Sequence, residues 1–351
     1  MNAIVLTKIG TICALQAAIS CAEGFRPTLH WSQLPLLPDK LGMAGSFAGV
    51  SGGALVVAGG ANFPDKMPWE GGTKVWRDPV FVLDQPNGQW RHAGKLPRPL
   101  GYGMSVSHAD AVICAGGSDA TRHYRETFRL RWENDAIQTE ALPLLPRPCA
   151  NLSGAVVGDT LYVAGGIETP LATNTMSAFW ALDLSDAKAQ WRELEPWPGP
   201  SRMLAIAAAQ GGDFFLFGGV GLRGGPDGKP ERIWLRDAWR YRTGAGWTRL
   251  ADLPKPCVAA PSPAPVVKGR VLLLAGDDGS RVSFQPLDKH PGFPKTVLAY
   301  DFTRDCWSEA GEVPAPRATL PCVEWRGMFV VPSGEARPGV RSPEVWSMRA
   351  P

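Results

Sequence analysis

An apolar run that ends in two small residues recurs six times along the chain, and this repeat constrains the fold more than any other feature. The copies are ALVVAGG (54–60), AVICAGG (111–117), LYVAGG (161–166), FFLFGG (214–219), VLLLAGD (271–277) and MFVVPSG (328–334). Successive copies end 57, 49, 53, 58 and 57 residues apart. Self-similarity at a period of this size is typical of propellers and solenoids, in which each repeat is one supersecondary unit.

Each repeat contains further strand-like segments. One segment reads VFVLD (80–84), AFWALD (178–183), AWRY (238–241) or VLAYD (297–301), and the next opens at Trp90, Trp191, Trp247 or Trp307 and runs into Pro. Together with the apolar run that ends in the small-residue pair and another apolar run before it, these two segments make four strands per repeat. The 40 Gly and 33 Pro of the chain favour short strands and turns over helices. We therefore predict four-stranded antiparallel blades.

The two ends of the chain indicate how the ring closes. The sixth repeat supplies its third strand at 344–346 and then ends, while its missing Trp-led strand stands at 29–35 (LHWSQLP). Two repeats depart from the pattern, with Ile137 in place of a Trp and Asp277 in place of the second Gly. We predict an all-β, six-bladed β-propeller over 23–351, closed by one N-terminal strand paired with three C-terminal strands, which removes free sheet edges.

Residues 1–22 have the composition of a cleaved signal peptide. Lys8 precedes an apolar stretch at 9–19, small residues follow, and the stretch is short for a transmembrane span. The prediction is a periplasmic or secreted protein without a transmembrane span. The alternative is lipid anchoring at Cys21, because the segment at 18–21 loosely matches a bacterial lipobox.

Other functional classes are disfavoured. The net charge of +3 comes without a basic run, which argues against a nucleic-acid partner. No C-x-x-C pair occurs and the five His are scattered, so we expect no metal site. GVSGG (49–53) and GVGLRG (219–224) match catalytic and dinucleotide-binding patterns, but a hairpin and a turn-rich loop replace the helix that each would need.

Two segments interrupt the repeat with charged residues beside Gly, at 59–76 and at 333–341. Long connections of this kind are often functional. The first contains the candidate ligand-binding residues Asn62 and Glu70, and the second contains Glu335 and Arg341, six residues apart around a Pro-Gly turn. The alternative for the second pair is a rim salt bridge with little energetic value.

The repeats resemble kelch repeats, and two segments resemble one enzyme family more closely. SGEARPGVRS (333–342) and MPWEGGTKVW (67–76) are similar to segments of bacterial N-acetylneuraminate epimerases, which are sialic acid mutarotases with a six-bladed kelch propeller. The order of the two segments is inverted here, so the chain looks like a cyclically permuted member. The resemblance implies that Glu335 is the proton acceptor, Arg341 the active-site arginine, and Glu70 a further family glutamate.

Mutarotation of a 2-keto sugar acid suits these residue types and requires no cofactor. The ring opens when a base removes the anomeric hydroxyl proton and the ring oxygen is protonated, and a carboxylate can act as that base. An arginine can bind the substrate carboxylate. We expect further substrate-binding arginines in the Pro-Arg turns, namely Arg98, Arg147, Arg202 and Arg317. Two alternatives remain: a non-catalytic propeller that binds carbohydrate or protein, and a mutarotase for another acidic sugar.

Overall fold

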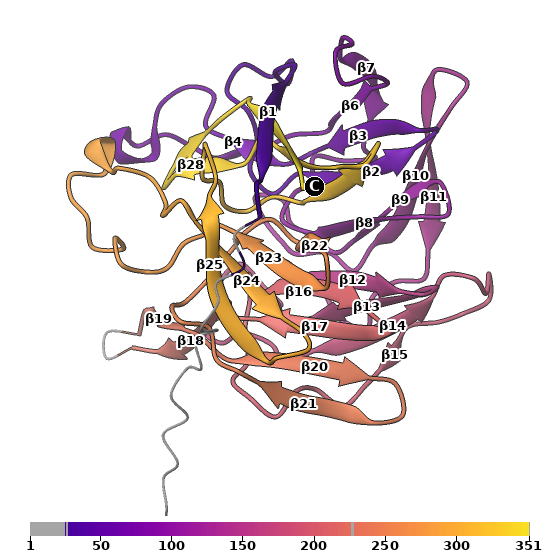
Figure 1. Ribbon diagram of the computed structural model, residues 1–351. Coiled ribbons are helices and arrows are strands. Elements are labelled where there is room, and N and C mark those ends of the chain that lie inside the picture. The colour runs from indigo at the N-terminus through magenta and orange to yellow at the C-terminus, as the bar shows by residue number, and fades with distance from the viewer. Residues whose placement is uncertain (1–24, 26, 226–227, 351) are drawn as a thin grey trace, which may run out of the picture.

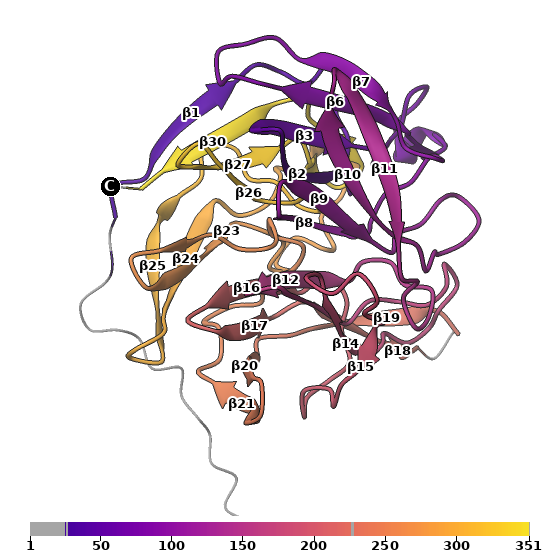
Figure 2. The same cartoon turned by 90° about the vertical axis from the view of Figure 1, so that its right-hand side faces the viewer.

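The computed structural model describes residues 25, 27–225 and 228–350, and the predicted signal peptide and Cys21 lie outside them. Six four-stranded antiparallel sheets are arranged as blades around one axis (Figures 1 and 2). Within the described ranges, the helical elements are two 3₁₀ turns, η1 (Pro68–Glu70) and η2 (Leu287–Lys289). The predicted six-bladed propeller is therefore confirmed.

In the first three blades the strands follow one another in chain order from the axis outward. Blade 1 contains β2 (Phe47–Ser51), β3 (Ala54–Ala58), β6 (Pro79–Leu83) and β7 (Arg91–Lys95). Blade 2 contains β8 (Met104–His108), β9 (Ala111–Ala115), β10 (Thr127–Glu133) and β11 (Ala136–Leu142). Blade 3 contains β12 (Ser153–Val157), β13 (Thr160–Ala164), β14 (Phe179–Asp183) and β15 (Arg192–Glu193).

The last three blades complete the ring, and the last of them combines both ends of the chain. Blade 4 contains β16 (Ile206–Gln210), β17 (Asp213–Phe217), β20 (Ala238–Arg242) and β21 (Gly246–Leu250). Blade 5 contains β22 (Val266–Val267), β23 (Arg270–Leu274), β24 (Thr296–Asp301) and β25 (Cys306–Glu312). Blade 6 contains β26 (Val323–Trp325), β27 (Met328–Pro332), β30 (Val345–Arg349) and β1 (His30–Leu34).

Apolar layers fill the space between every pair of adjacent blades, because the alternation along each strand places side chains on both sheet faces. Phe47 of blade 1 packs on Phe128 of blade 2, with ring centroids 6.0 Å apart. The Trp residues at the outer strands add a second link: the Trp307 indole N–H of blade 5 donates to the Ala251 carbonyl of blade 4 at 2.8 Å. Trp90, Trp191 and Trp247 make the same kind of bond to the preceding blade.

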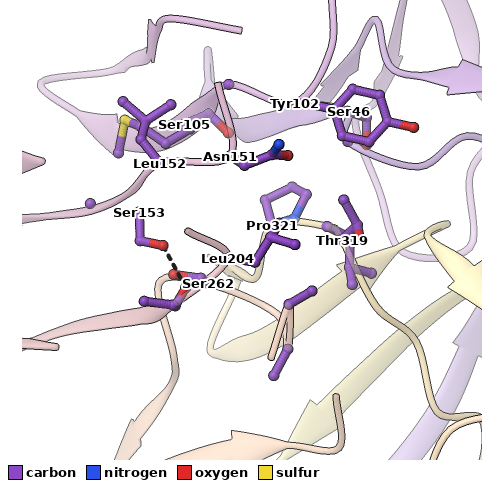
Figure 3. Close-up of a pocket in the computed structure, with 18 residues that line it drawn as sticks. Ser46, Tyr102, Ser105, Asn151, Leu152, Ser153, Leu204, Ser262, Thr319 and Pro321 are labelled. Carbon is purple, nitrogen blue, oxygen red and sulfur yellow. Dashed lines mark hydrogen bonds between the residues drawn. The ribbon is translucent and has the colours of Figure 1, made fainter. Parts of the chain in front are cut away.

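A closed ring of backbone hydrogen bonds surrounds the axis. One residue per blade, just before the innermost strand, has left-handed backbone torsions (φ between 54° and 68°). Its N–H donates to the carbonyl of the equivalent residue in the neighbouring blade, at 2.7–2.9 Å around the circle. The six residues, four of which are labelled in Figure 3, are Gly45, Tyr102, Asn151, Leu204, Ala259 and Thr319.

Three blades carry an extra two-stranded hairpin directly after the small-residue pair. Blade 1 has β4 (Ala61–Asn62) with β5 (Val75–Trp76), blade 4 has β18 (Val220–Gly224) with β19 (Pro230–Trp234), and blade 6 has β28 (Glu335–Arg337) with β29 (Val340–Arg341). The labelled strands of these hairpins lie on the same side of the ring, on the left of Figure 1.

Candidate functional site

A cavity of about 440 Å³ opens on the axis, on the side that carries the hairpins. Five members of the backbone ring line it, and side chains from blades 1, 2, 4, 5 and 6 add charge. This volume is in the range of sites for small molecules. The charged and titratable side chains in the lining are Lys74, Tyr102, Asp119, His123, Arg232, Asp277, Glu335 and Arg341.

Glu335 and Arg341 face each other across the β28–β29 hairpin, where they form a cross-strand pair. Glu335 Oε1 accepts hydrogen bonds from the Gly339 N–H at 2.8 Å and from Arg341 Nη1 at 3.1 Å. Among the described residues, Oε2 has no hydrogen-bond partner, and the Glu335 side chain is 20% exposed. The hairpin therefore orients one carboxylate oxygen and leaves the other available in the cavity.

Arg341 is held more tightly than the sequence suggested. Its side chain is 4% exposed, Nη2 donates to the Tyr102 hydroxyl at 3.3 Å, and Nε donates to the Ala61 carbonyl at 3.3 Å. The guanidinium also lies 4.8 Å from the Phe63 ring centroid. Arg341 is thus positioned to hold and polarise Glu335, rather than to offer an uncommitted guanidinium to a ligand.

Two other cations in the lining form no ion pair with any described residue. Lys74 Nζ lies 4.9 Å from the Tyr102 ring centroid and 5.3 Å from that of Trp76, so aromatic rings support it at the cavity wall. Arg232 reaches the cavity from the β18–β19 hairpin. An anionic ligand in this cavity would meet both cations.

Two further carboxyl groups line the cavity in opposite environments. Burial alone would raise the pKa of Asp119, but hydrogen bonds from Tyr124, Thr121 and Arg122 outweigh it and hold the pKa well below its ordinary value. Burial raises the pKa of Asp277, against the weaker opposing effect of the Gly279 N–H. Relative to an ordinary carboxyl group, the environment therefore stabilises the ionised form of Asp119 and the protonated form of Asp277.

Glu70 and Asn62 lie beside the cavity without lining it. Glu70 is exposed at the end of η1, and its Oε2 accepts the Met67 N–H at 3.0 Å. Asn62 is fully buried, donates to the Gly42 carbonyl at 3.0 Å and accepts from Arg77 Nε at 3.0 Å. In this structure both brace the segment at 59–76, and their role in binding the ligand stays a prediction.

The arginines of the Pro-Arg turns do not surround the cavity. Arg202 is fully buried, ion-paired with Asp237 and bonded to the Gly218 carbonyl at 2.8 Å. Arg317 is buried and paired with Glu344. These two link strands within their blades, and their role in binding substrate stays a prediction.

Arg98 and Arg147 also lie outside the lining, and each is about half exposed at the surface. Arg98 Nη2 lies 3.3 Å from Glu126 Oε1, and Arg147 Nη1 lies 3.7 Å from Glu168 Oε2. The physical reason is the same for all four arginines, because each stands two to four residues before the member of the backbone ring that reaches the axis. The arginines of these turns therefore contribute to the blades themselves, and a shared ligand-binding face stays a prediction.

Sequence reasoning missed Lys74, Arg232 and Asp277 as lining residues. In every blade, the residue after the small-residue pair forms a β-bridge with the residue that precedes the member of the backbone ring. This regularity was a usable signal for Asp277. In blade 5 the pair is Ala275-Gly276, so Asp277 follows the pair rather than replacing its second Gly. The residues at this position are Ala61, Ser118, Ile167, Val220, Asp277 and Glu335. Aligning the repeats on this position would have placed Asp277 beside Glu335.

Neither a metal cluster nor a membrane-spanning helix occurs in the described part of the chain. Its residues include no group of three or more His, Cys, Asp or Glu arranged to hold a metal ion. No helix within the same ranges has the length and apolar character needed to cross a membrane.

The fold and the cavity define a class: a six-bladed β-propeller with an axial site in which an arginine orients a carboxylate and further cations line the wall. Comparison with known proteins agrees. The model of the N-acetylneuraminate epimerase family matches residues 22–139 and 142–281. The chain belongs to this family.

Curated relatives support the assignment over shorter stretches. An N-acetylneuraminate epimerase of Salmonella enteritidis is 46% identical over 101 residues, which cover 25% of this chain and 26% of the relative. One from Brucella suis is 35% identical over 127 residues, 32% of each chain. The alignments thus span about a quarter to a third of the relatives' length. The cyclic permutation stays a prediction.

Proposed function

We propose that this protein is a mutarotase that interconverts the α- and β-anomers of N-acetylneuraminate. One observation carries the proposal: Glu335 is held through one oxygen by Arg341 and Gly339, and its other oxygen is open to the axial cavity. Membership of the epimerase family and the names of the relatives support this substrate.

In the proposed reaction, Glu335 Oε2 removes the proton of the anomeric hydroxyl at C2. The bond between C2 and the ring oxygen breaks, and a second group protonates the ring oxygen. Rotation of the open-chain keto acid exposes the other face of C2, and ring closure returns both protons. Lys74 and Arg232 bind the substrate carboxylate, because charge-assisted hydrogen bonds to a carboxylate are the strong ones.

The test is NMR of freshly released α-anomer with and without the protein. We expect faster approach to the equilibrium mixture with wild-type protein, and a loss of ~10²–10⁴-fold in kcat for Glu335→Gln, the usual contribution of a general base. Glu324→Gln is the matched control, because Glu324 is an exposed glutamate of the same blade that lies away from the axial cavity.

Two results would contradict the proposal. Wild-type protein that binds the sugar without accelerating mutarotation would support a non-catalytic binding propeller instead. Faster mutarotation of other 2-keto sugar acids than of N-acetylneuraminate would keep the mechanism and change the substrate.

We also propose that the protein acts in the periplasm after cleavage of a signal peptide, and that its blades are kelch repeats. The composition of residues 1–22 supports the location. N-terminal sequencing of protein from the periplasmic fraction tests this proposal.

A further inference from the structure

Ring opening needs a proton donor for the ring oxygen as well as a base for the anomeric hydroxyl, and the inference about that donor rests on the proposed function. Glu335 supplies the base. The donor must reach the same bound sugar from another part of the lining, and it must be protonated when the ring opens.

Asp277 occupies in blade 5 the position that Glu335 occupies in blade 6. Each is the residue after the small-residue pair. Each forms a β-bridge with the residue that precedes the backbone-ring member of its blade, Val258 for Asp277 and Ala318 for Glu335. Both side chains line the axial cavity. Two carboxyl groups on neighbouring blades therefore flank one sector of the cavity.

The surroundings of Asp277 leave its carboxyl group largely uncommitted. Oδ1 accepts one hydrogen bond, from the Gly279 N–H at 3.0 Å, and the other oxygen has no partner among the described residues. Arg232 on β19, Asp278 next along the chain and His290 after η2 are the charged or titratable groups that act on it. Burial nevertheless has the largest effect and raises the pKa of Asp277.

Other lining groups are poorer donors. Asp119 accepts bonds from the Thr121 and Arg122 N–H groups and the Tyr124 hydroxyl, which keep it ionised. Burial lowers the pKa of His123. Its Nδ1–H already donates a hydrogen bond to the Ile167 carbonyl at 3.0 Å. Tyr102 and Lys74 are the remaining rivals, but a phenol and an ammonium group are ordinarily far weaker acids than a carboxyl group.

We propose that Asp277 is the general acid that protonates the ring oxygen as the ring opens. Glu335 takes the anomeric proton, the electron pair of that O–H bond forms the C2 carbonyl, and the pair of the broken C2–O bond takes the proton of Asp277. On closure Asp277 removes that proton and Glu335 returns its own to the C2 oxygen. Protons and electrons balance over the cycle, as they must for an isomerisation without a cofactor.

The test compares Asp277→Asn with wild-type protein in the NMR assay between pH 5 and pH 9. We expect kcat to fall ~10²–10⁴-fold with KM changed by less than about twofold, because the amide fills the same space but has no acidic proton. Wild-type kcat should fall as pH rises through the raised pKa of Asp277, since the donor must be protonated. That alkaline decline should be absent from the residual activity of Asp277→Asn.

Controls separate this assignment from a structural effect. Asp186→Asn removes a carboxylate from an exposed loop of blade 3, outside the lining, and should keep kcat and KM near wild type. Asp277→Glu retains a carboxyl group and should recover part of the activity, with an alkaline decline at a shifted pH. If Asp277→Asn does not fold, the pH profile of Asp277→Glu decides: an unshifted alkaline decline would overturn the assignment.

The remaining outcomes are distinct. If wild-type protein is active and Asp277→Asn has the same kcat, the role of Asp277 alone is overturned. The same holds if Tyr102→Phe by itself removes the alkaline decline. A wild-type protein that does not accelerate mutarotation overturns the proposed function and this role with it.

Discussion

At the scale of single residues, the cavity divides its charges into two groups. Arg341 has its guanidinium occupied by Glu335, Tyr102 and the Ala61 carbonyl, so it serves the carboxylate of the protein. Lys74 and Arg232 have no carboxylate partner among the described residues. Arg341 thus acts on the Glu335 carboxylate, whereas Lys74 and Arg232 are available to bind the charge of a ligand.

This division predicts different kinetic effects. We expect Lys74→Ala and Arg232→Ala each to raise KM by ~10-fold or more with little change in kcat, because a charge-assisted bond to the substrate carboxylate is worth ~1.5–3 kcal/mol in both ground and transition states. Lys188→Ala, on an exposed loop of blade 3, is the control. A fall in kcat at constant KM would instead place these cations in the chemical step.

At the scale of elements, the β28–β29 hairpin that carries Glu335 and Arg341 depends on a neighbour from blade 1. Gly339 at its turn packs so closely on Pro68 of η1 that a Cβ atom there would lie 2.5 Å from Pro68 Cγ. Arg337 lies over the Trp69 ring, 5.8 Å from its centroid. Glu70 closes the η1 turn by accepting the Met67 N–H. This gives Glu70 a positioning role.

A conservative pair of variants tests this role. Glu70→Ala should lower kcat several-fold and leave KM nearly unchanged, because the support of the hairpin loosens while Lys74 and Arg232 stay in place. Glu70→Gln should restore most of the activity, since its amide oxygen can still accept the Met67 N–H. Equal losses in both variants would indicate that the charge of Glu70 matters, as direct contact with substrate would require.

The sequence predicted the blades well because Gly-Gly and Trp mark local events: the end of a strand and the start of the outermost one. It predicted the Glu335–Arg341 pair for the same reason, since one short hairpin holds both. It did not predict the ion pairs of Arg202 and Arg317, whose partners Asp237 and Glu344 lie 35 and 27 residues further along the chain. It also missed Arg232, because the sequence was interpreted as a turn-rich loop where the structure has the β18–β19 hairpin.

At the scale of the whole molecule, the backbone ring joins all six blades in one circuit at the floor of the cavity. Each member must adopt a left-handed conformation, which costs a non-glycine residue about 1–2 kcal/mol. Five of the six members are not glycine, so the surrounding packing must hold them in place. We therefore expect the ring to break only when the blades separate.

Thr319 provides the test. Its N–H donates to the Ala259 carbonyl at 2.7 Å with φ at 59°. Thr319→Pro loses the donor and cannot adopt this torsion, so we expect a loss of about 3 kcal/mol or more in the free energy of unfolding in urea. Thr319→Gly keeps the donor and accepts the torsion, and should unfold within about 1 kcal/mol of wild type. Equal midpoints for the two variants would show that the ring contributes little.

The same backbone ring also limits the path of a ligand along the axis. Beneath it the axial space shrinks to about 60 Å³, enough for water but too small for a sugar, before the axis widens again at the opposite face. A sugar that enters on the hairpin side must leave through the same opening of the cavity. In the proposed mutarotation, substrate and product would therefore compete for one entrance, and each anomer would inhibit conversion of the other. Net turnover would slow as the mixture nears equilibrium, so this proposed activity would be of most use where another process keeps removing one anomer.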